Sequence, residues 1–214
     1  MEYNEQEQQI VSDIPVAEES VQVEEKKAVS SPKKLFRDAR DIIIIMTVFM
    51  LAYVLFFRAV VVVGNSMYDT LINGDRLLLV SNSLYRNPQP GDIIVASKDS
   101  FRDGECIIKR VIAVEGDLVD IDFANGIVYV NGEALEEEYV FSPTVDPEGV
   151  KFPLTVESGC VFVMGDNRRD SMDSRSLQIG QIDEREILGK VIFLIFPGLD
   201  MAGNRDFSRI GVVR

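Results

Sequence analysis

The chain has 214 residues, a hydrophobic content of 46% and a formal net charge of −13 at pH 7. This composition allows one modest globular domain, and the acidic charge excludes nucleic acid as a general partner, because phosphate backbones need a basic surface. The absence of histidine excludes a Ser-His-Asp triad and a histidine-ligated metal. A serine nucleophile would therefore need another base, and lysine is the obvious candidate.

Residues 1–34 carry a polar opening run and two acidic pairs, Glu18-Glu19 and Glu24-Glu25, with almost no aromatic residues. Such a segment buries too little apolar surface to offset the entropy lost on ordering. We therefore predict a disordered acidic tail in the cytoplasm rather than a binding motif.

Ile42–Phe57 is an uncharged run, IIIIMTVFMLAYVLFF. As a helix it would extend about 24 Å, close to the roughly 30 Å of a bilayer core, and Arg58 could snorkel at its end. Because the run is apolar on every face, a membrane span is favoured over a buried core helix. We assign residues 35–59 to a basic juxtamembrane segment and one transmembrane helix.

Basic residues precede this run at positions 26, 27, 33, 34, 37 and 40. The positive-inside rule then places the N-terminus in the cytoplasm and the C-terminal domain outside the plasma membrane. A cleaved signal peptide is the competing interpretation, but its n-region would be about forty residues long, and no good small-x-small site follows. We predict an uncleaved, single-pass anchor.

From residue 60 onward, short apolar runs alternate with turn signals such as Pro90-Gly91-Asp92. Ala124-Asn125-Gly126 separates two strand-like runs and predicts a hairpin, because Asn-Gly accommodates positive φ. No capped amphipathic helix and no internal repeat is visible. We predict a mainly β fold, in which an antiparallel sheet or barrel-like domain over residues 60–214 follows the transmembrane helix.

Three segments of this domain are candidates for chemistry. Ser66 follows Gly64 at a strand end, where a close backbone approach and an oxyanion-binding amide are feasible, although a turn serine is the simpler interpretation. Residues 165–175, GDNRRDSMDSR, follow an apolar run and predict either a hydrogen-bonded loop that supports a site or a solvated turn.

The third segment is the β-type run Ile107–Ile112, which Lys109 interrupts. Alternation places Lys109 on an apolar face, where loss of hydration lowers the pKa of a lysine; to act near pH 8 it must fall from about 10.4. Arg110 is equally surrounded on the opposite face. One of the two could instead be a structural ion-pair residue, or both could lie at a polar sheet edge.

Cys106 and Cys160 do not form a CxxC unit. With two thiols and no histidine we expect no zinc site and no cofactor. Two buried thiols are the favoured interpretation, and a disulfide is the alternative if the domain faces an oxidising compartment.

Together these segments resemble the bacterial type I signal peptidases, membrane-bound Ser-Lys proteases. The resemblance covers nearly all of the chain from Asp41 on, and the eukaryotic-type relatives differ in using a histidine base. Five motifs appear in family order: GNSM (64–67) with Thr70-Leu71, GD (74–75) with LLLV (77–80), PGDIIV (90–95), IKRV (108–111) with Gly116-Asp117, and the GDNR…DSR segment.

The resemblance implies that Ser66 is the nucleophile, with its amide in the oxyanion hole, and that Lys109 is the general base. Ser171 would orient Lys109 by a hydrogen bond. Gly64 stands where some relatives supply a second oxyanion donor from a side chain, so here that donor must be another group. The implied structural ion pairs near the site are Arg110 with Asp166 and Asp173 with Arg175.

The implied activity is removal of signal peptides from secretory preproteins, which bind extended and carry small residues in an Ala-x-Ala-like cleavage site. The implied domain is antiparallel β, with an apolar surface on the lipid bilayer of a bacterial cell. We expect a monomer.

Two departures from the family pattern stand out. Asp69 replaces the usual proline before Thr70, and its charge would favour the ammonium form of Lys109 if it lay within about 6 Å. The acidic residue after GDNR is displaced by one, to Asp170. The first departure supports an alternative, a membrane-anchored module that binds extended peptides with weak or no catalysis. A self-cleaving repressor-type Ser-Lys protease is a further alternative, but the DNA-binding domain of that class is not visible.

Overall fold

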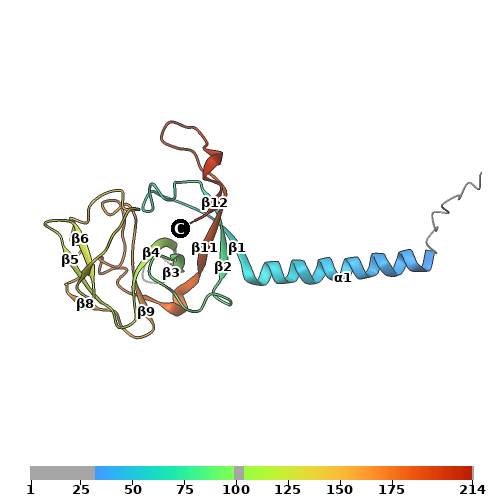
Figure 1. The fold of residues 1–214 in the computed structure, drawn as a ribbon, viewed down its shortest axis with the longest axis horizontal. Coiled ribbons are helices and arrows are strands. Elements are labelled where there is room, and N and C mark those ends of the chain that lie inside the picture. The colour runs from blue at the N-terminus through green and yellow to red at the C-terminus, as the bar shows by residue number, and fades with distance from the viewer. Residues whose placement is uncertain (1–31, 99–103, 214) are drawn as a thin grey trace, which may run out of the picture. The chain divides into compact units, whose positions relative to one another are not determined.

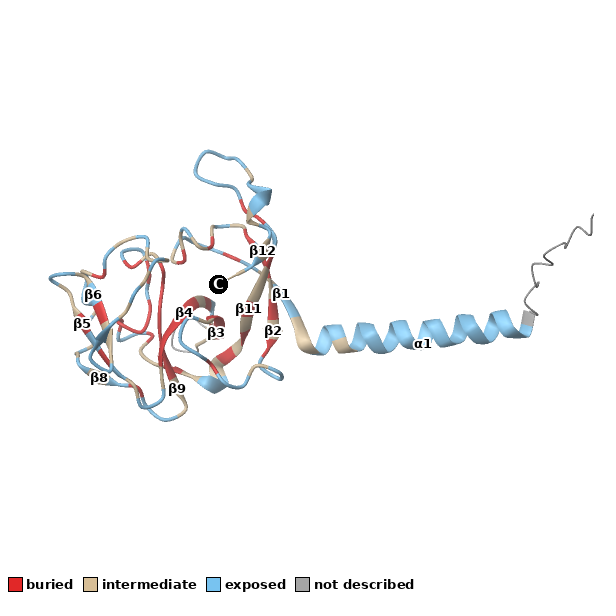
Figure 2. Cartoon of the chain, viewed as in Figure 1, coloured by how far each residue is buried: buried red, intermediate tan, exposed pale blue. Residues whose placement is uncertain are grey.

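The N-terminal element of the computed structural model is one long helix, α1 (Pro32–Phe56). The structure describes residues 32–98 and 104–213, so the predicted disordered tail lies largely outside the described residues. In the described chain α1 is the single helix long and apolar enough to cross a membrane. Its apolar side chains are exposed along its length (Figure 2), with Ile45 and Phe49 each 67% accessible. An exposed apolar surface of this size marks a contact with a membrane or with another protein.

The larger of two sheets follows the helix and has eight strands in the order β1-β2-β11-β3-β4-β9-β10, with β12 paired to β11 (Figure 1). Every pairing between these strands is antiparallel. Its first strand includes residues 57–59, for which the sequence pattern predicted the end of the membrane segment. The strands are β1 (Phe57–Val61), β2 (Arg76–Ser81), β3 (Ile93–Ser97), β4 (Cys106–Val114), β9 (Cys160–Met164), β10 (Ile182–Asp183), β11 (Ile187–Phe196) and β12 (Gly211–Val212).

The smaller sheet has the order β7-β6-β5-β8 and contains the predicted hairpin. Asp122 lies opposite Ile127, and in the loop between them Gly126 has φ +73° while Asp122 Oδ1 accepts hydrogen bonds from the amides of residues 124 and 125. The prediction of a mainly antiparallel β fold is confirmed. The strands are β5 (Leu118–Asp122), β6 (Ile127–Val130), β7 (Glu133–Ala134) and β8 (Leu154–Thr155), and two short 3₁₀ turns follow at Glu184–Glu186 and Phe207–Arg209.

One of the core clusters anchors the loop that follows β1. Met67 and Leu71 come from this loop, and each is only 1% exposed. They pack with the inward-facing residues of β2, where burial alternates with the strand period. The other buried members are Val62, Leu77, Leu79, Ile93, Val95, Val191 and Leu194. The position of Ser66, between Val62 and Met67, is therefore set by apolar packing on both sides.

We expect Leu79→Ala to lower the free energy of unfolding by roughly 2–5 kcal/mol, because the vacated space lies in the closed core beneath the Ser66 loop. Leu118→Ala is the matched control, since Leu118 is 42% exposed. Thermal or denaturant unfolding of the two variants provides the measurement. Equal losses in both would contradict the description of this cluster as tightly packed.

Candidate active site

The loop from Val62 to Asp75 carries Ser66 and is closed at its neck by two backbone hydrogen bonds. The Val62 amide donates to Asp75 O at 2.8 Å, and the Gly74 amide donates to Val62 O at 2.9 Å. Gly64 has φ +93°, a conformation that favours glycine, and its amide donates to Asn73 Oδ1 at 3.1 Å. The Gly64 amide is thus occupied within the loop and does not supply the missing oxyanion donor.

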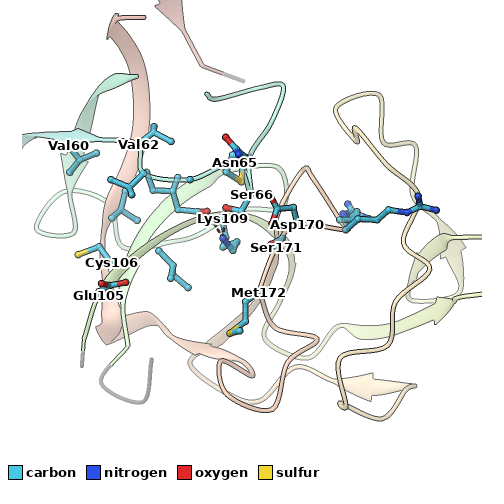
Figure 3. Close-up of a pocket in the computed structure, with 18 of the residues that line it drawn as sticks. Val60, Val62, Asn65, Ser66, Glu105, Cys106, Lys109, Asp170, Ser171 and Met172 are labelled. Carbon is cyan, nitrogen blue, oxygen red and sulfur yellow. Dashed lines mark hydrogen bonds between the residues drawn. The ribbon is translucent and has the colours of Figure 1, made fainter. Parts of the chain in front are cut away.

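Lys109 reaches this loop from the middle of β4, where it pairs with Ile94 of β3. Its Nζ donates to Ser66 Oγ at 2.8 Å and to the Ile108 carbonyl at 3.1 Å (Figure 3). The lysine is 5% exposed. The distance from Nζ to Oγ lies within the range required of a nucleophile and its base.

Burial lowers the pKa of Lys109 to about 8. Three carboxylates oppose this fall by stabilising the ammonium: Asp173 has the largest effect, followed by Glu148 and Asp166. Asp69, the departure noted in the sequence, is exposed and is not among the groups with the largest effects. At mildly alkaline pH a large fraction of Lys109 is therefore neutral and can accept a proton.

The segment after β9 holds the backbone next to and at Ser66 through hydrogen bonds. The Asn167 amide donates to Ser66 O at 3.0 Å, and its side chain donates to Asn65 O at 3.3 Å. A Cβ added to Gly165 would overlap both Ser66 O and Ser171 Oγ. Sequence reasoning did not single out Gly165 and Asn167, although both lie in the GDNR motif. A glycine after a buried strand was the available signal.

Arg110 and Asp166 form a buried, two-pronged ion pair. Arg110 Nε lies 2.9 Å from Asp166 Oδ1, and NH2 lies 2.7 Å from Oδ2. Asp166 also accepts Thr70 Oγ1 at 2.6 Å, and the Arg110 guanidinium stacks on Tyr139 at 3.9 Å from the ring centroid. The pair therefore links β4, which carries Lys109, to the loop that carries Ser66.

Ser171 contacts a different partner from the expected one. Its hydroxyl donates to Asp173 Oδ2 at 2.8 Å, and no hydrogen bond from Lys109 to Ser171 occurs in the described chain. Arg175 holds Asp173 through Nε at 2.8 Å and NH2 at 2.9 Å, and pairs with Glu148 at 3.0 Å. Ser171 thus contacts the carboxylate that acts on Lys109, rather than the lysine itself.

Arg168 and Glu137 stabilise the segment that follows β9. The sequence pattern predicted no role for either residue. Arg168 donates from Nε to Gly165 O at 3.0 Å and from NH1 to Thr144 Oγ1 at 2.6 Å, and its guanidinium pairs with Glu137. The Arg168 side chain is almost fully buried. The sequence spacing of Glu137 and Arg168 does not predict their contact, because the two residues are 31 positions apart and meet only in the folded chain.

A cavity of about 870 Å³ opens in front of Ser66 and Lys109. Val60–Val63 and residues 105–108 line it on the β1 and β4 sides, while the labelled residues Asp170, Ser171 and Met172 lie beyond the dyad (Figure 3). In the described chain the Ser66 amide donates to no protein acceptor. It is free to bind a negative charge that develops on a substrate oxygen.

Cys106 and Cys160 are free thiols, so the disulfide alternative is not realised. Cys106 is exposed at the cavity and Cys160 is partly buried, which corrects the expectation of two buried thiols. Among the described residues no group of three His, Cys, Asp or Glu side chains could hold a metal ion.

Comparison with known proteins assigns the sequence to a family. Residues 35–196 match the family model described as signal peptidase, peptidase S26. A probable signal peptidase I-1 of Synechocystis sp. is 40% identical over 141 residues, covering 63% of this chain and 68% of the relative. A signal peptidase I of Bacillus licheniformis is 33% identical over 181 residues, covering 81% of this chain and 95% of the relative.

A crystal structure of a signal peptidase I from Enterococcus faecalis is also similar to this chain. It has 30% sequence identity and a TM-score of 0.41, and the match covers 49% of this chain and 97% of the other.

The family model and the two sequence relatives define a class: this is a serine peptidase that removes signal peptides. The chain belongs to the signal peptidase family, peptidase S26. The suspected resemblance is thereby confirmed, and so is the expectation that secretory preproteins are the substrate class. The alternative of a binding module without catalysis loses its support.

We expect Glu148→Gln to lower the pKa of Lys109 further, because Glu148 is one of the carboxylates that raise it. The side-chain NMR shift of Lys109, followed against pH and assigned with Lys109→Met, measures the change. Asp69→Asn is the matched control and should leave the titration in place. An unchanged Lys109 titration in Glu148→Gln would contradict the assigned electrostatics.

Proposed function

We propose that Ser66 and Lys109 form a Ser-Lys dyad that cleaves preproteins through an acyl-enzyme. The observation that carries this proposal is the hydrogen bond of 2.8 Å from Lys109 Nζ to Ser66 Oγ, beside the cavity. The lowered pKa of Lys109 supports it, because a neutral amine is needed to take the serine proton.

The substrate would bind in an extended form between two strand edges that have no pairing partner in the described chain. β1 is the terminal strand of its sheet, and residues 106–109 of β4 pair with β3 on one side, while β9 joins β4 only from Arg110 on. Both edges line the cavity. A preprotein segment can add there through main-chain hydrogen bonds, with small side chains of an Ala-x-Ala-like site in the shallow spaces between.

The reaction then proceeds in two balanced steps. Lys109 Nζ takes the Ser66 proton as Oγ attacks the P1 carbonyl, and the Ser66 amide donates to the oxyanion. The ammonium returns its proton to the leaving amine, and the peptide bond breaks. Lys109 next takes a proton from water as the water attacks the ester, and the ammonium then gives that proton to the departing Ser66 Oγ, which releases the signal peptide. No metal or cofactor enters the scheme.

The buried ion pairs would hold the dyad in register. The Arg110–Asp166 pair connects β4 to Thr70 of the nucleophile loop. Arg175 fixes Asp173, the carboxylate that raises the pKa of Lys109 most. We assign Ser171 an indirect role, as a hydrogen-bond donor that holds Asp173. Gly64 would contribute turn geometry rather than an oxyanion donor.

We expect Ser66→Ala and Lys109→Met each to reduce preprotein cleavage by roughly 10⁴-fold or more, because each removes one half of a unit that acts together. Ser158→Ala and Lys98→Met are the matched controls, since their partners are Glu115 and Glu186, away from the dyad. Cleavage by purified protein in detergent is the measurement. Persisting cleavage in either dyad variant would exclude the mechanism.

We further propose that α1 anchors the enzyme in the bacterial plasma membrane as a single span. The tail would be cytoplasmic, and the catalytic domain, residues 60–214, extracytoplasmic. The apolar surface of α1 and the basic residues before it support this orientation. Because all of the site residues come from one chain, a monomer suffices.

Protease added to intact spheroplasts should degrade the catalytic domain and leave a tag at the N-terminus protected. The reason is that only the side opposite the basic flank is accessible. A cytoplasmic marker protein controls for leakage, and immunoblotting of both ends reports the result. Degradation of the N-terminal tag with survival of the domain would reverse the proposed orientation.

A further inference from the structure

The carboxylate of Asp75 is fully buried at the neck of the nucleophile loop. Within its own loop it accepts one hydrogen bond, from the Ile72 amide at 2.9 Å. Its other donors come from the C-terminal segment. The Gly198 amide lies 2.6 Å from Oδ1, and Arg209 NH1 and NH2 lie 3.0 Å and 2.8 Å from Oδ1 and Oδ2.

Arg209 also contacts the loop at a second point. Its NH2 donates to the Thr70 carbonyl at 3.1 Å, and the hydroxyl of the same threonine donates to Asp166, the partner of Arg110. The Arg209 guanidinium thus connects Asp75, at the neck of the loop, to Thr70, which links the loop to β4 through Asp166. A planar fork of donors is required for this, because two acceptors lie in different directions.

The C-terminal segment is held against the loop by close packing as well as by charge. A Cβ on Gly198 would overlap the carbonyl of Asn73, so the two backbones touch. β12, next to the 3₁₀ turn that carries Arg209, pairs with β11, and the loop between these strands is the red segment of Figure 1. Residues 198 and 209 both lie beyond position 196, where the family match ends.

We propose that Arg209 is a positioning residue for Ser66, an inference that rests on the proposed dyad. Without Arg209, the buried Asp75 carboxylate loses its only charged partner in the described chain, and leaving a buried charge unpaired is strongly unfavourable. The neck of the loop then has to shift. Small displacements of a nucleophile from its base cost about 10²-fold in rate, so the effect appears in the chemical step.

The test is single-turnover cleavage of a preprotein by the full-length enzyme in saturating excess. The limiting rate constant in this experiment does not depend on the fraction of enzyme that folded, so a loss of stability alone leaves it unchanged. For Arg209→Met we expect it to fall about 10–100-fold, with the pH midpoint retained. Arg205→Met is the matched control, because Arg205 stacks on Phe196 and bonds to Pro197 O without contacting the loop.

Arg209→Lys supplies the second variant. A single ammonium can pair with Asp75 but cannot also reach Thr70 as the fork does, so we expect an intermediate limiting rate. If Arg209→Met does not fold, a reduced rate in Arg209→Lys supports the proposal. A wild-type limiting rate in whichever variant folds overturns it.

A parallel reaction with Ser66→Ala distinguishes a failure of the proposed dyad from a failure of the proposed role of Arg209. If Ser66→Ala cleaves like the wild type, the dyad itself is wrong. If Ser66→Ala is inactive while Arg209→Met keeps the wild-type limiting rate, the dyad stands and the role of Arg209 is excluded.

Discussion

The burial of one lysine amine is the constraint on which the rest of the site depends. The pKa of Lys109 is about 8 in the fold against 10.5 for a free lysine, a difference worth roughly 3 kcal/mol. The folded state binds the proton more weakly than the unfolded state does, so this cost is largest below pH 8 and disappears as the pH rises through 10.5. The rest of the domain must supply the stability that offsets it.

The carboxylates around Lys109 act against the proposed chemistry and yet are needed for the architecture. Asp173 and Asp166 raise the pKa of the lysine, but each also accepts from an arginine and from a hydroxyl of a loop that forms the site. Pairing with arginine neutralises much of their charge where it would favour the ammonium. The arrangement keeps the hydrogen-bond geometry of buried carboxylates while limiting their effect on the base.

Much of this fold and of the candidate site could be predicted from the sequence. The other features could not, for physical reasons that can be named. Strand alternation and turn residues predicted the β5–β6 hairpin, and the isolated Lys109 in an apolar strand marked the base candidate. The partner of Ser171 was not predictable, because Lys109 and Asp173 lie within reach of each other only after folding. Arg209 and Asp75 are 134 residues apart in the sequence, and no local pattern predicts a contact over such a separation.

The edges of β1 and β4 at the cavity, which are unpaired among the described residues, carry a risk as well as a use. Unpaired main-chain groups on a strand edge can join the edge of another molecule and start aggregation. The chain has a formal net charge of −13 at pH 7, and a net charge far from zero keeps copies of a protein apart in solution. Two copies meeting edge to edge would repel each other, and this repulsion would keep the groove open to a less acidic chain. The net charge of the chain would thus serve both solubility and access to the groove.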